Sequence, residues 1–276
     1  MSETPESYPQ RPGRPADLSE WEIDAEQVAE NPLQREIVNV LVSSLKELIA
    51  ARGWKNVQVL CNTFFAWLPE RPMVRVSPDV YLLDAPPKRL PGMWQTWKPE
   101  NRPPFWALEI LSEDWHKDYD QVPPKYEELG CRELVVFDPD AAMGLTNVPR
   151  RVPLTIYRRT AEGKLAVEYS GRGPAFSQEL GVWLVPGREG YSARLRLSED
   201  EAGTRLVPTG DEKSAAKDGA LAAKDVELEA ERSAKEQERA AKEEERAAKE
   251  KERAGREAAE ATVARLEQQL REKKPS

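Results

Sequence analysis

Two acidic residues stand where the sequence predicts buried β-strands. Glu109 lies within the apolar, aromatic run 105–112, and Asp79 opens the apolar run 80–83. Both runs are short, follow a proline and contain neither Gly nor Pro, which favours strands. An ionised carboxylate in such a strand costs several kcal/mol unless it is paired, protonated or bound to a metal. We therefore predict that Asp79 and Glu109 form a metal-binding carboxylate pair.

Phosphodiester hydrolysis is one reaction that such a pair supports. Carboxylates that hold Mg²⁺ against a scissile phosphate are accompanied by a cation near the attacking water or the developing charge. Lys117 and Lys125 are the nearest lysines downstream of Glu109, and Asp118 and Tyr126 accompany them. The alternative for the acids is a structural role at the strand ends.

The histidine and cysteine content limits the other chemistries. His116 is the single histidine, so a multi-histidine zinc site is excluded, and any Ser-His-Asp or Cys-His arrangement would have to include it. The nucleophile signature G-x-S-x-G is absent from the sequence. The metal expected is therefore a hard, oxygen-ligated cation, Mg²⁺ or Mn²⁺. Cys61 and Cys131 lie in apolar contexts typical of core residues, so we expect no disulfide framework.

The composition limits the possible partners of the protein and its location in the cell. The net charge is −8, and residues 1–210 alone carry −6, so a DNA contact would need a local basic surface. The Trp-rich segment from Lys88 to Arg102 is one candidate; a loop that covers the core with its tryptophans is the alternative. No run of 18 apolar residues exists, so we expect no membrane span. Residues 1–17 are Pro-rich and polar, unlike a secretory signal, and we expect a cytoplasmic protein.

Hydrophobic periodicity and the positions of Gly, Pro and capping residues predict the elements that would position these residues. Asn31 as N-cap, Pro32 in the first turn and Gly53 at the end delimit an amphipathic helix. Other predictions are strands at 57–60, 63–68, 80–83, around Glu109 and at 133–138, a hairpin of 154–159 with 164–169, a loop over 85–104 and a short helix over 123–129. Together they predict an α/β or α+β fold around a mixed β-sheet.

The last part of the chain has a different pattern. From about Ser214 a seven-residue repeat places Glu four residues before Lys or Arg, and each such pair adds about 0.2–0.5 kcal/mol of helix stability. The four pairs are Glu231/Lys235, Glu238/Lys242, Glu245/Lys249 and Glu252/Arg256. Apart from Val263, Leu266 and Leu270 at a/d spacing, the apolar residues are mostly alanine. We predict a long, solvated helix that dimerises weakly.

These patterns divide the chain into three parts. Residues 1–20 are expected to form a disordered segment, residues 21–210 a globular domain, and residues 211–276 a helical or weakly coiled-coil tail. The globular part is long enough to bury a substantial core.

The ordered set of motifs resembles a known family. The motifs are residues 77–80, residues 109–112, Asp118 with Tyr126, residues 129–139 and residues 175–184. In this order they resemble the Uma-two family of restriction-endonuclease-like proteins, within the PD-(D/E)XK nuclease superfamily, over roughly residues 25–208. An Ala/Glu/Arg-rich helical tail is common in that family. The resemblance implies a mixed β-sheet flanked by helices, Asp79 and Glu109 as acids that bind Mg²⁺ or Mn²⁺, and DNA as the substrate.

The sequence departs from the family pattern at two places. Members often carry a lysine four residues after the aspartate that matches Asp118, where this chain has Val122. Lys125 or Lys117 would then supply the cation. A polar residue is frequent in the N-terminal helix, where this chain has Gln34, with Glu36 two residues on. Together with Ser112, Asp118 and Tyr126, these two residues are candidates for supporting roles.

Three functions remain open on the sequence alone. The first is a Mg²⁺-dependent DNA endonuclease. The second is a catalytically weakened protein that keeps the nuclease fold and binds partners through its helical tail. The third is a hydrolase for another phosphodiester or nucleotide. A homodimer, formed through the globular domain or the tail, is compatible with each of them.

Overall fold

The computed structural model describes residue 14 and residues 17–23, 32–111 and 115–272. The chain forms two units, Met1–Lys213 and Ser214–Ser276. The first holds the β-sheets and the shorter helices, and the described part of the second belongs to the helix α4 (Gly210–Glu272). Within these described ranges, no helix has a stretch apolar enough to cross a bilayer.

A six-stranded mixed sheet forms the centre of the first unit. Its strands, in spatial order, are β1 (Val57–Leu60), β4 (Val80–Asp84), β6 (Trp106–Ile110), β7 (Glu133–Phe137), β8 (Leu154–Arg159) and β9 (Leu165–Gly171). The pair β6–β7 is parallel and the other neighbours are antiparallel. Parallel neighbours need a crossover connection, which α2 (Trp115–Leu129) supplies. The predicted mixed sheet in an α/β fold is confirmed.

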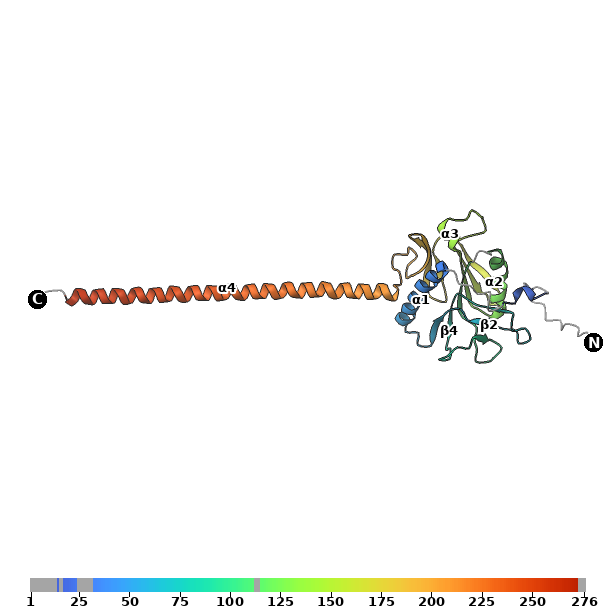
Figure 1. Ribbon diagram of the computed structural model, residues 1–276, viewed down its shortest axis with the longest axis horizontal. Coiled ribbons are helices and arrows are strands. Elements are labelled where there is room, and N and C mark those ends of the chain that lie inside the picture. Colours follow the sequence, from blue (N-terminus) through green and yellow to red (C-terminus); the bar gives the residue numbers. More distant parts are fainter. Residues whose placement is uncertain (1–13, 15–16, 24–31, 112–114, 273–276) are drawn as a thin grey trace, which may run out of the picture. The chain divides into compact units, whose positions relative to one another are not determined.

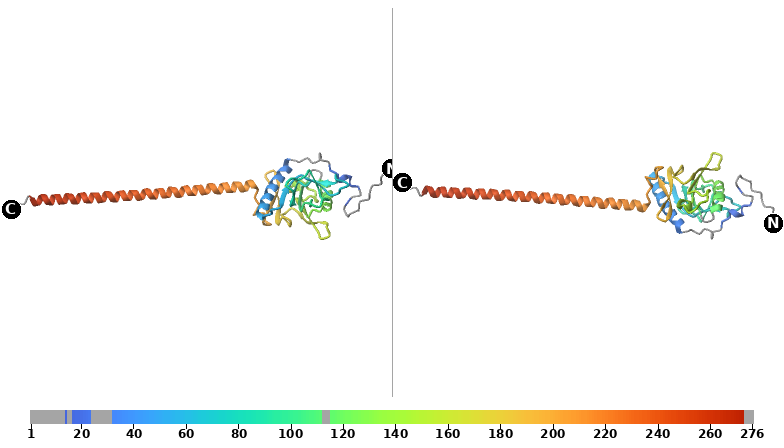
Figure 2. Two further views of the ribbon diagram at one scale, coloured as in Figure 1. Left: turned by 90° about the horizontal axis from the view of Figure 1, so that it is seen from below. Right: turned by 90° about the horizontal axis from the view of Figure 1, so that it is seen from above.

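Helices and smaller sheets cover both faces of this sheet (Figures 1 and 2). One face packs against α1 (Pro32–Arg52), α3 (Pro139–Met143) and the sheet of β10 (Ala175–Ser177), β11 (Val182–Glu189) and β12 (Ser192–Ser198). The other packs against α2 and the sheet of β3 (Arg75–Val76), β2 (Phe64–Ala66) and β5 (Met93–Gln95). Successive strand residues face opposite sides, so Val80 contributes to the α1 core and Tyr81 to the α2 core. A short 3₁₀ helix, η1 (Ser19–Trp21), precedes these helices and strands in the chain.

The helix α2 begins earlier than the sequence predicted. A helix over 123–129 was expected, but α2 starts at Trp115 and contains both Pro123 and Pro124 in its interior. An interior proline costs about 3 kcal/mol because it removes a backbone N–H and crowds the preceding turn. Packing outweighs this cost, since Tyr119 and Tyr126 are buried against the central sheet. Tertiary contacts therefore decide where this helix begins.

The predicted loop over 85–104 contains a strand, which corrects the expectation of an irregular segment. Its β5 pairs in parallel with β2 and carries Trp94, which is buried. The indole Nε1–H of Trp94 donates to the carbonyl oxygen of Arg102 at 2.9 Å. The basic side chains of the segment, including Lys88 and Arg89, remain exposed. Trp94 thus belongs to the core and Trp97 is half-buried, while the charged residues line the surface.

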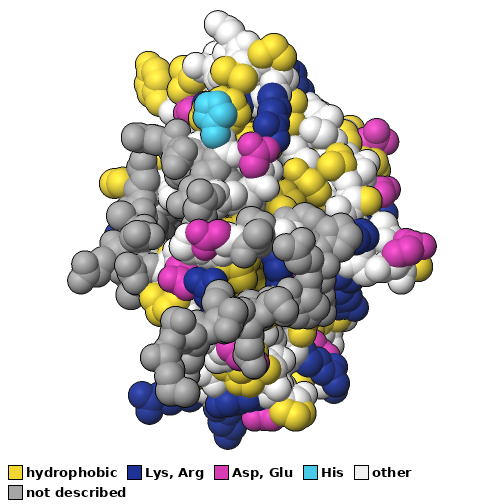
Figure 3. Space-filling model, turned by 90° about the vertical axis from the view of Figure 1, so that its right-hand side faces the viewer, with side chains coloured by type: hydrophobic (Ala, Val, Ile, Leu, Met, Phe, Trp, Pro, Cys, Tyr) yellow, Lys and Arg dark blue, Asp and Glu magenta, His cyan; other side chains and the backbone are white. Residues whose placement is uncertain are grey.

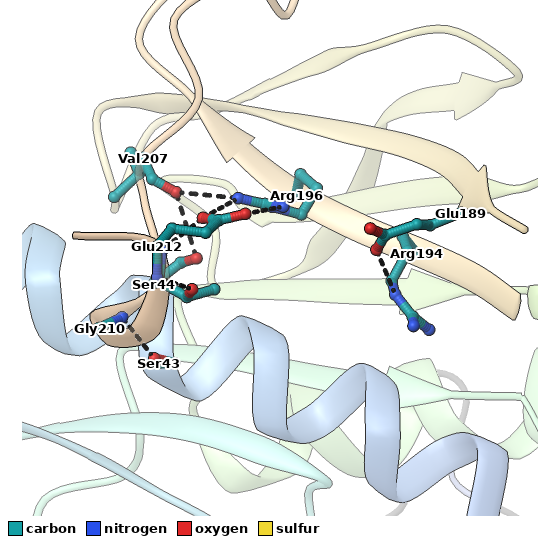
Figure 4. Close-up of polar contacts among 9 residues, drawn as sticks. Ser43, Ser44, Glu189, Arg194, Arg196, Val207, Gly210 and Glu212 are labelled. Carbon is teal, nitrogen blue, oxygen red and sulfur yellow. Dashed lines mark hydrogen bonds and ion pairs between the residues drawn. The ribbon is translucent and has the colours of Figure 1, made fainter. Parts of the chain in front are cut away.

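The first turn of α4 belongs to the first unit and is held there by polar contacts (Figure 4). Thr209 and Glu212 form a capping box: the Glu212 N–H donates to Thr209 Oγ1 at 3.2 Å, and the Thr209 N–H donates to the Glu212 carboxylate at 2.7 Å. Arg196 of β12 donates two hydrogen bonds to the same carboxylate, at 3.0 and 2.7 Å. The Gly210 N–H donates to Ser43 Oγ of α1 at 2.9 Å. These contacts fix the residue at which the long helix starts.

Ion pairs four residues apart support the rest of α4, which leads to a first prediction. The predicted pairs are present at 2.6, 2.5, 2.6 and 2.8 Å. Replacing their four glutamates with glutamine should weaken the helix by about 0.2–0.5 kcal/mol per pair. Hydrogen–deuterium exchange of the tail should accelerate, and 1 M NaCl should have a similar effect on the unaltered chain because it screens the pairs. The glutamates replaced are Glu231, Glu238, Glu245 and Glu252.

A matched variant controls for the loss of charge as such. It carries glutamine at four exposed glutamates of the same helix that lie outside these pairs, and its exchange should change less. The control positions are Glu229, Glu243, Glu244 and Glu260. Equal acceleration in both variants would contradict a stabilising role for the pairs.

Candidate active site

Glu109 lies on β6, and Asp79 immediately precedes the neighbouring strand β4. The antiparallel register of β4 and β6 pairs Val80 with Leu108 and Tyr81 with Ala107. One further step along this register places Asp79 across from Glu109. Directly opposed residues on antiparallel strands share a face, with Cβ atoms about 4.5–5.5 Å apart. Extending this alternation by one residue puts both side chains on the α2 side of the sheet, where the Tyr126 phenol interacts with each of them.

Neutral donors orient each carboxylate. Asp79 is only 8 % exposed, and its Oδ2 accepts the backbone N–H of Ile110 at 2.7 Å. Its Oδ1 accepts the side-chain amide N–H of Gln34, at the start of α1, at 2.5 Å. Glu109 is half-buried, and its Oε1 accepts the hydroxyl of Tyr126 from α2. These donors help to hold the two acids in place.

The electrostatics of Tyr126 link the two acids. Tyr126 is fully buried, and burial raises the pKa of its phenol well above the usual value. The negative charges of Glu109 and Asp79 raise this pKa further. The hydroxyl therefore stays protonated and available as a donor to Glu109. The charges of both carboxylates therefore act on the same phenol, which requires both acids to lie near Tyr126.

Lys125 is buried on α2, next to Tyr126 in the sequence. Its side chain is 4 % exposed, and its Nζ lies 5.9 Å from the centroid of the Trp21 ring. Val122, which occupies the usual lysine position of the family, instead packs with the apolar core on the α2 side. Three residues along a helix rotate a side chain by about 300°, so Lys125 emerges close to the direction of Val122 and one turn further on.

The other predicted site residues are distributed differently. Glu36 is exposed and pairs with Arg194 of β12 at 3.0 Å, which lowers the pKa of its carboxyl. It thus has a partner away from the acid pair. Lys117 and Asp118 belong to the backbone of α2, but their side chains lie outside the described residues, as does the whole of Ser112. The Asn31 N-cap prediction also falls outside them.

Sequence reasoning missed Trp21. Its contact with Lys125 joins residues about a hundred positions apart, and no local pattern marks such a contact. The surplus of tryptophans in the chain is the one signal that was available, and it does not single out a position.

The donor set suits a hard divalent cation. Mg²⁺ is typically bound through one or two carboxylates, with waters and substrate phosphates completing its shell. Asp79 and Glu109 supply two such oxygens, and Glu109 is open enough to reach a ligand. Across the described ranges, no group of three or more His, Cys, Asp or Glu side chains is placed to hold a metal.

The fold, a mixed sheet flanked by helices, is that of a restriction-endonuclease-like protein. The Uma2 family model, described as "Putative restriction endonuclease", matches residues 5–185. The chain belongs to the Uma2 family. This membership supports a nuclease function and implies a nucleic-acid substrate.

Two chains among the solved structures match this one. The chain is similar to a protein from Anabaena variabilis described as a "putative nuclease belonging to DUF820", with 14 % sequence identity and a TM-score of 0.36. The match covers 54 % of this chain and 71 % of the other. No curated protein matches the chain.

Proposed function

We propose that the protein is a metal-dependent endonuclease that hydrolyses phosphodiester bonds of DNA. The observation that supports this most directly is the proximity of Asp79 to Glu109: the Asp79 carboxylate accepts the backbone N–H of Ile110, the residue next to Glu109. The buried Lys125 on the helix above that face is the second support.

Each residue has a distinct role in this proposal. Asp79 and Glu109 would hold Mg²⁺ or Mn²⁺. The metal, when bound, supplies an activated water and offsets the charge that develops on the phosphate. Lys125 stabilises the developing negative charge with its ammonium group. Gln34 and Tyr126 orient the two carboxylates, and Tyr126 does so as a proton donor that does not ionise near neutral pH.

The choice of Lys125 over Lys117 rests on burial. An ammonium group that is removed from water is costly unless it has a charged or polar partner, so a lysine that is 4 % exposed on the acid-bearing side is under strong constraint. The burial of Lys117 lies outside the described residues, and it has no comparable support.

Plasmid nicking tests the function. The purified full-length chain should convert supercoiled plasmid to the open-circular form in Mg²⁺ or Mn²⁺, and EDTA should stop the conversion. Absence of nicking across a panel of divalent metals, with single-stranded and double-stranded DNA, would contradict the proposal. A panel of nucleotides and other phosphodiesters then separates a different hydrolase from a protein without activity.

Replacing the proposed catalytic lysine gives a second prediction. Lys125→Met keeps the length of the side chain and removes its charge, so nicking should slow by about 10²–10³-fold, the usual loss for one electrostatic contact to a transition state. The control is Lys46→Met, at an exposed position of α1, which should leave the rate unchanged. The plasmid assay measures both variants. If Lys125→Met nicks plasmid as fast as the unaltered chain, Lys125 does not stabilise the developing charge, and Lys117 becomes the candidate.

A second candidate function is a binding protein that retains the nuclease fold and acts through its tail. The distribution of charge favours it: among the described residues visible in Figure 3, basic and acidic side chains are interspersed and do not form a continuous basic surface. The net charge of −8 also opposes attraction to DNA. Calorimetry with Mg²⁺ or Mn²⁺ discriminates the two functions, because only the nuclease needs a metal at the acid pair.

A further inference from the structure

The chain segment 17–23 is fastened to the edge of the first unit. Leu18 and Trp21 are each 2 % exposed and pack with the buried Val74. The N–H of Ile23 donates to the carbonyl oxygen of Met73 at 3.0 Å, and Nε of Arg75 donates to the carbonyl oxygen of Ile23 at 2.8 Å. Backbone and side-chain contacts therefore hold this segment as part of the domain.

Trp21 is the residue of this segment that reaches α2. Its ring lies 5.9 Å from Nζ of Lys125 and 6.4 Å from the ring of Trp67, which it meets at 58°. An ammonium group near the face of an indole is attracted to its π electrons, and the attraction is strongest where water is excluded. Both Trp21 and Lys125 are almost fully buried. The indole is thus one wall of the enclosure around the lysine.

We infer that Trp21 is a positioning residue for Lys125: its indole closes the solvent side of the lysine and restricts the ammonium to the buried conformation. Lysine has four rotatable side-chain bonds and loses much rotamer freedom when buried, so a packed aromatic neighbour that limits its rotamers helps to hold it in one place. The inference rests on the proposed role of Lys125. Gln34, thirteen residues further on, holds Asp79, so two positions in the first part of the chain support the two sides of the site.

Amine labelling measures this wall independently of nuclease activity. The folded, full-length chain is treated with a limiting acylating reagent, and the modification of Lys125 and of exposed Lys46 is followed by peptide mass spectrometry. In Trp21→Leu, labelling of Lys125 should accelerate by about tenfold, as expected for loss of a desolvated cation–π contact. Labelling of Lys46 should not change. Trp21→Phe retains an aromatic face and should stay close to the unaltered chain.

Leu18→Ala is the matched structural control. It removes packing from the same cluster without removing the indole, so Lys125 labelling should rise less than in Trp21→Leu. In the plasmid assay, Trp21→Leu should lower kcat with little change in KM, because DNA binding is preserved while the lysine is misplaced. Equal labelling of Lys125 in Trp21→Leu and the unaltered chain, or equal acceleration in Leu18→Ala, would overturn the inference. If the unaltered chain cleaves no DNA, labelling still decides the role of Trp21, while the nuclease proposal fails separately.

Discussion

Asp79→Asn and Glu109→Gln should each abolish Mg²⁺-dependent nicking, with a loss of about 10³-fold or more, because each removes one anionic ligand of a site that has two. Both changes preserve side-chain size. The amide oxygen of asparagine can still accept a hydrogen bond from Ile110 or Gln34, so the fold should persist. The measurement is the initial rate of open-circle formation over a titration of Mg²⁺.

Asp84→Asn is the matched control for this pair of variants. Asp84 lies at the other end of β4, is exposed and pairs with Arg102 at 3.1 Å. Its replacement removes the same charge from the same strand and should leave nicking unchanged. Thermal unfolding of all three variants distinguishes lost chemistry from lost structure. Wild-type rates in Asp79→Asn or Glu109→Gln would rule out the acid pair as the catalytic centre.

Arg151→Met should lower the free energy of unfolding by about 3–5 kcal/mol, because it leaves the buried carboxylate of Asp138 without its arginine partner. Asp138 is fully buried, and Arg151 donates to its two oxygens at 2.7 and 2.8 Å. Asp138 in turn raises the pKa of the Arg151 guanidinium above its already high value. Its Oδ1 also accepts the N–H of Ala141 in the first turn of α3 at 3.0 Å. Urea unfolding, followed by tryptophan fluorescence, measures the loss.

The neighbouring arginine provides the control. Arg150 pairs with Asp120, and both side chains are more than half exposed, so Arg150→Met should change stability by no more than about 1 kcal/mol. The double variant Asp138→Asn/Arg151→Met should be more stable than Arg151→Met alone, because it removes the uncompensated charge. Equal destabilisation by Arg150→Met and Arg151→Met would contradict the account. The pair matters for the site because Asp138 follows β7 directly, and β7 is the parallel partner of the strand that carries Glu109.

Much of the fold could be predicted from local patterns. The strand predicted at 57–60 has those bounds, and the runs around residues 80–83 and Glu109 became β4 and β6. Such runs are identifiable because buried strands are short, apolar and bounded by turn residues. The proline pair misled the prediction for α2, and the strand β5 was hidden in a Pro/Trp-rich segment. In both places packing against the sheet overrides local propensity.

The candidate site was only partly open to prediction. Two residues along a helix correspond to a rotation of about 200°, so their side chains point to nearly opposite sides. Gln34 and Glu36 could therefore not both face the acids. The sequence left that choice open, and the docking of α1 puts Gln34 against Asp79 and Glu36 against Arg194. The burial of Lys125 likewise depends on the segment that contains Trp21, which is distant in sequence.

The sequence by itself determined that two acids enter apolar strands, that a mixed α/β fold contains them and that a charged helix follows the domain. These are consequences of composition and short-range periodicity. The tertiary structure decided which residues lie beside Asp79, because neighbours across strands depend on strand register, which is a long-range property. It also decided which lysine is enclosed and which residue encloses it, because burial results from elements that meet only in the folded chain.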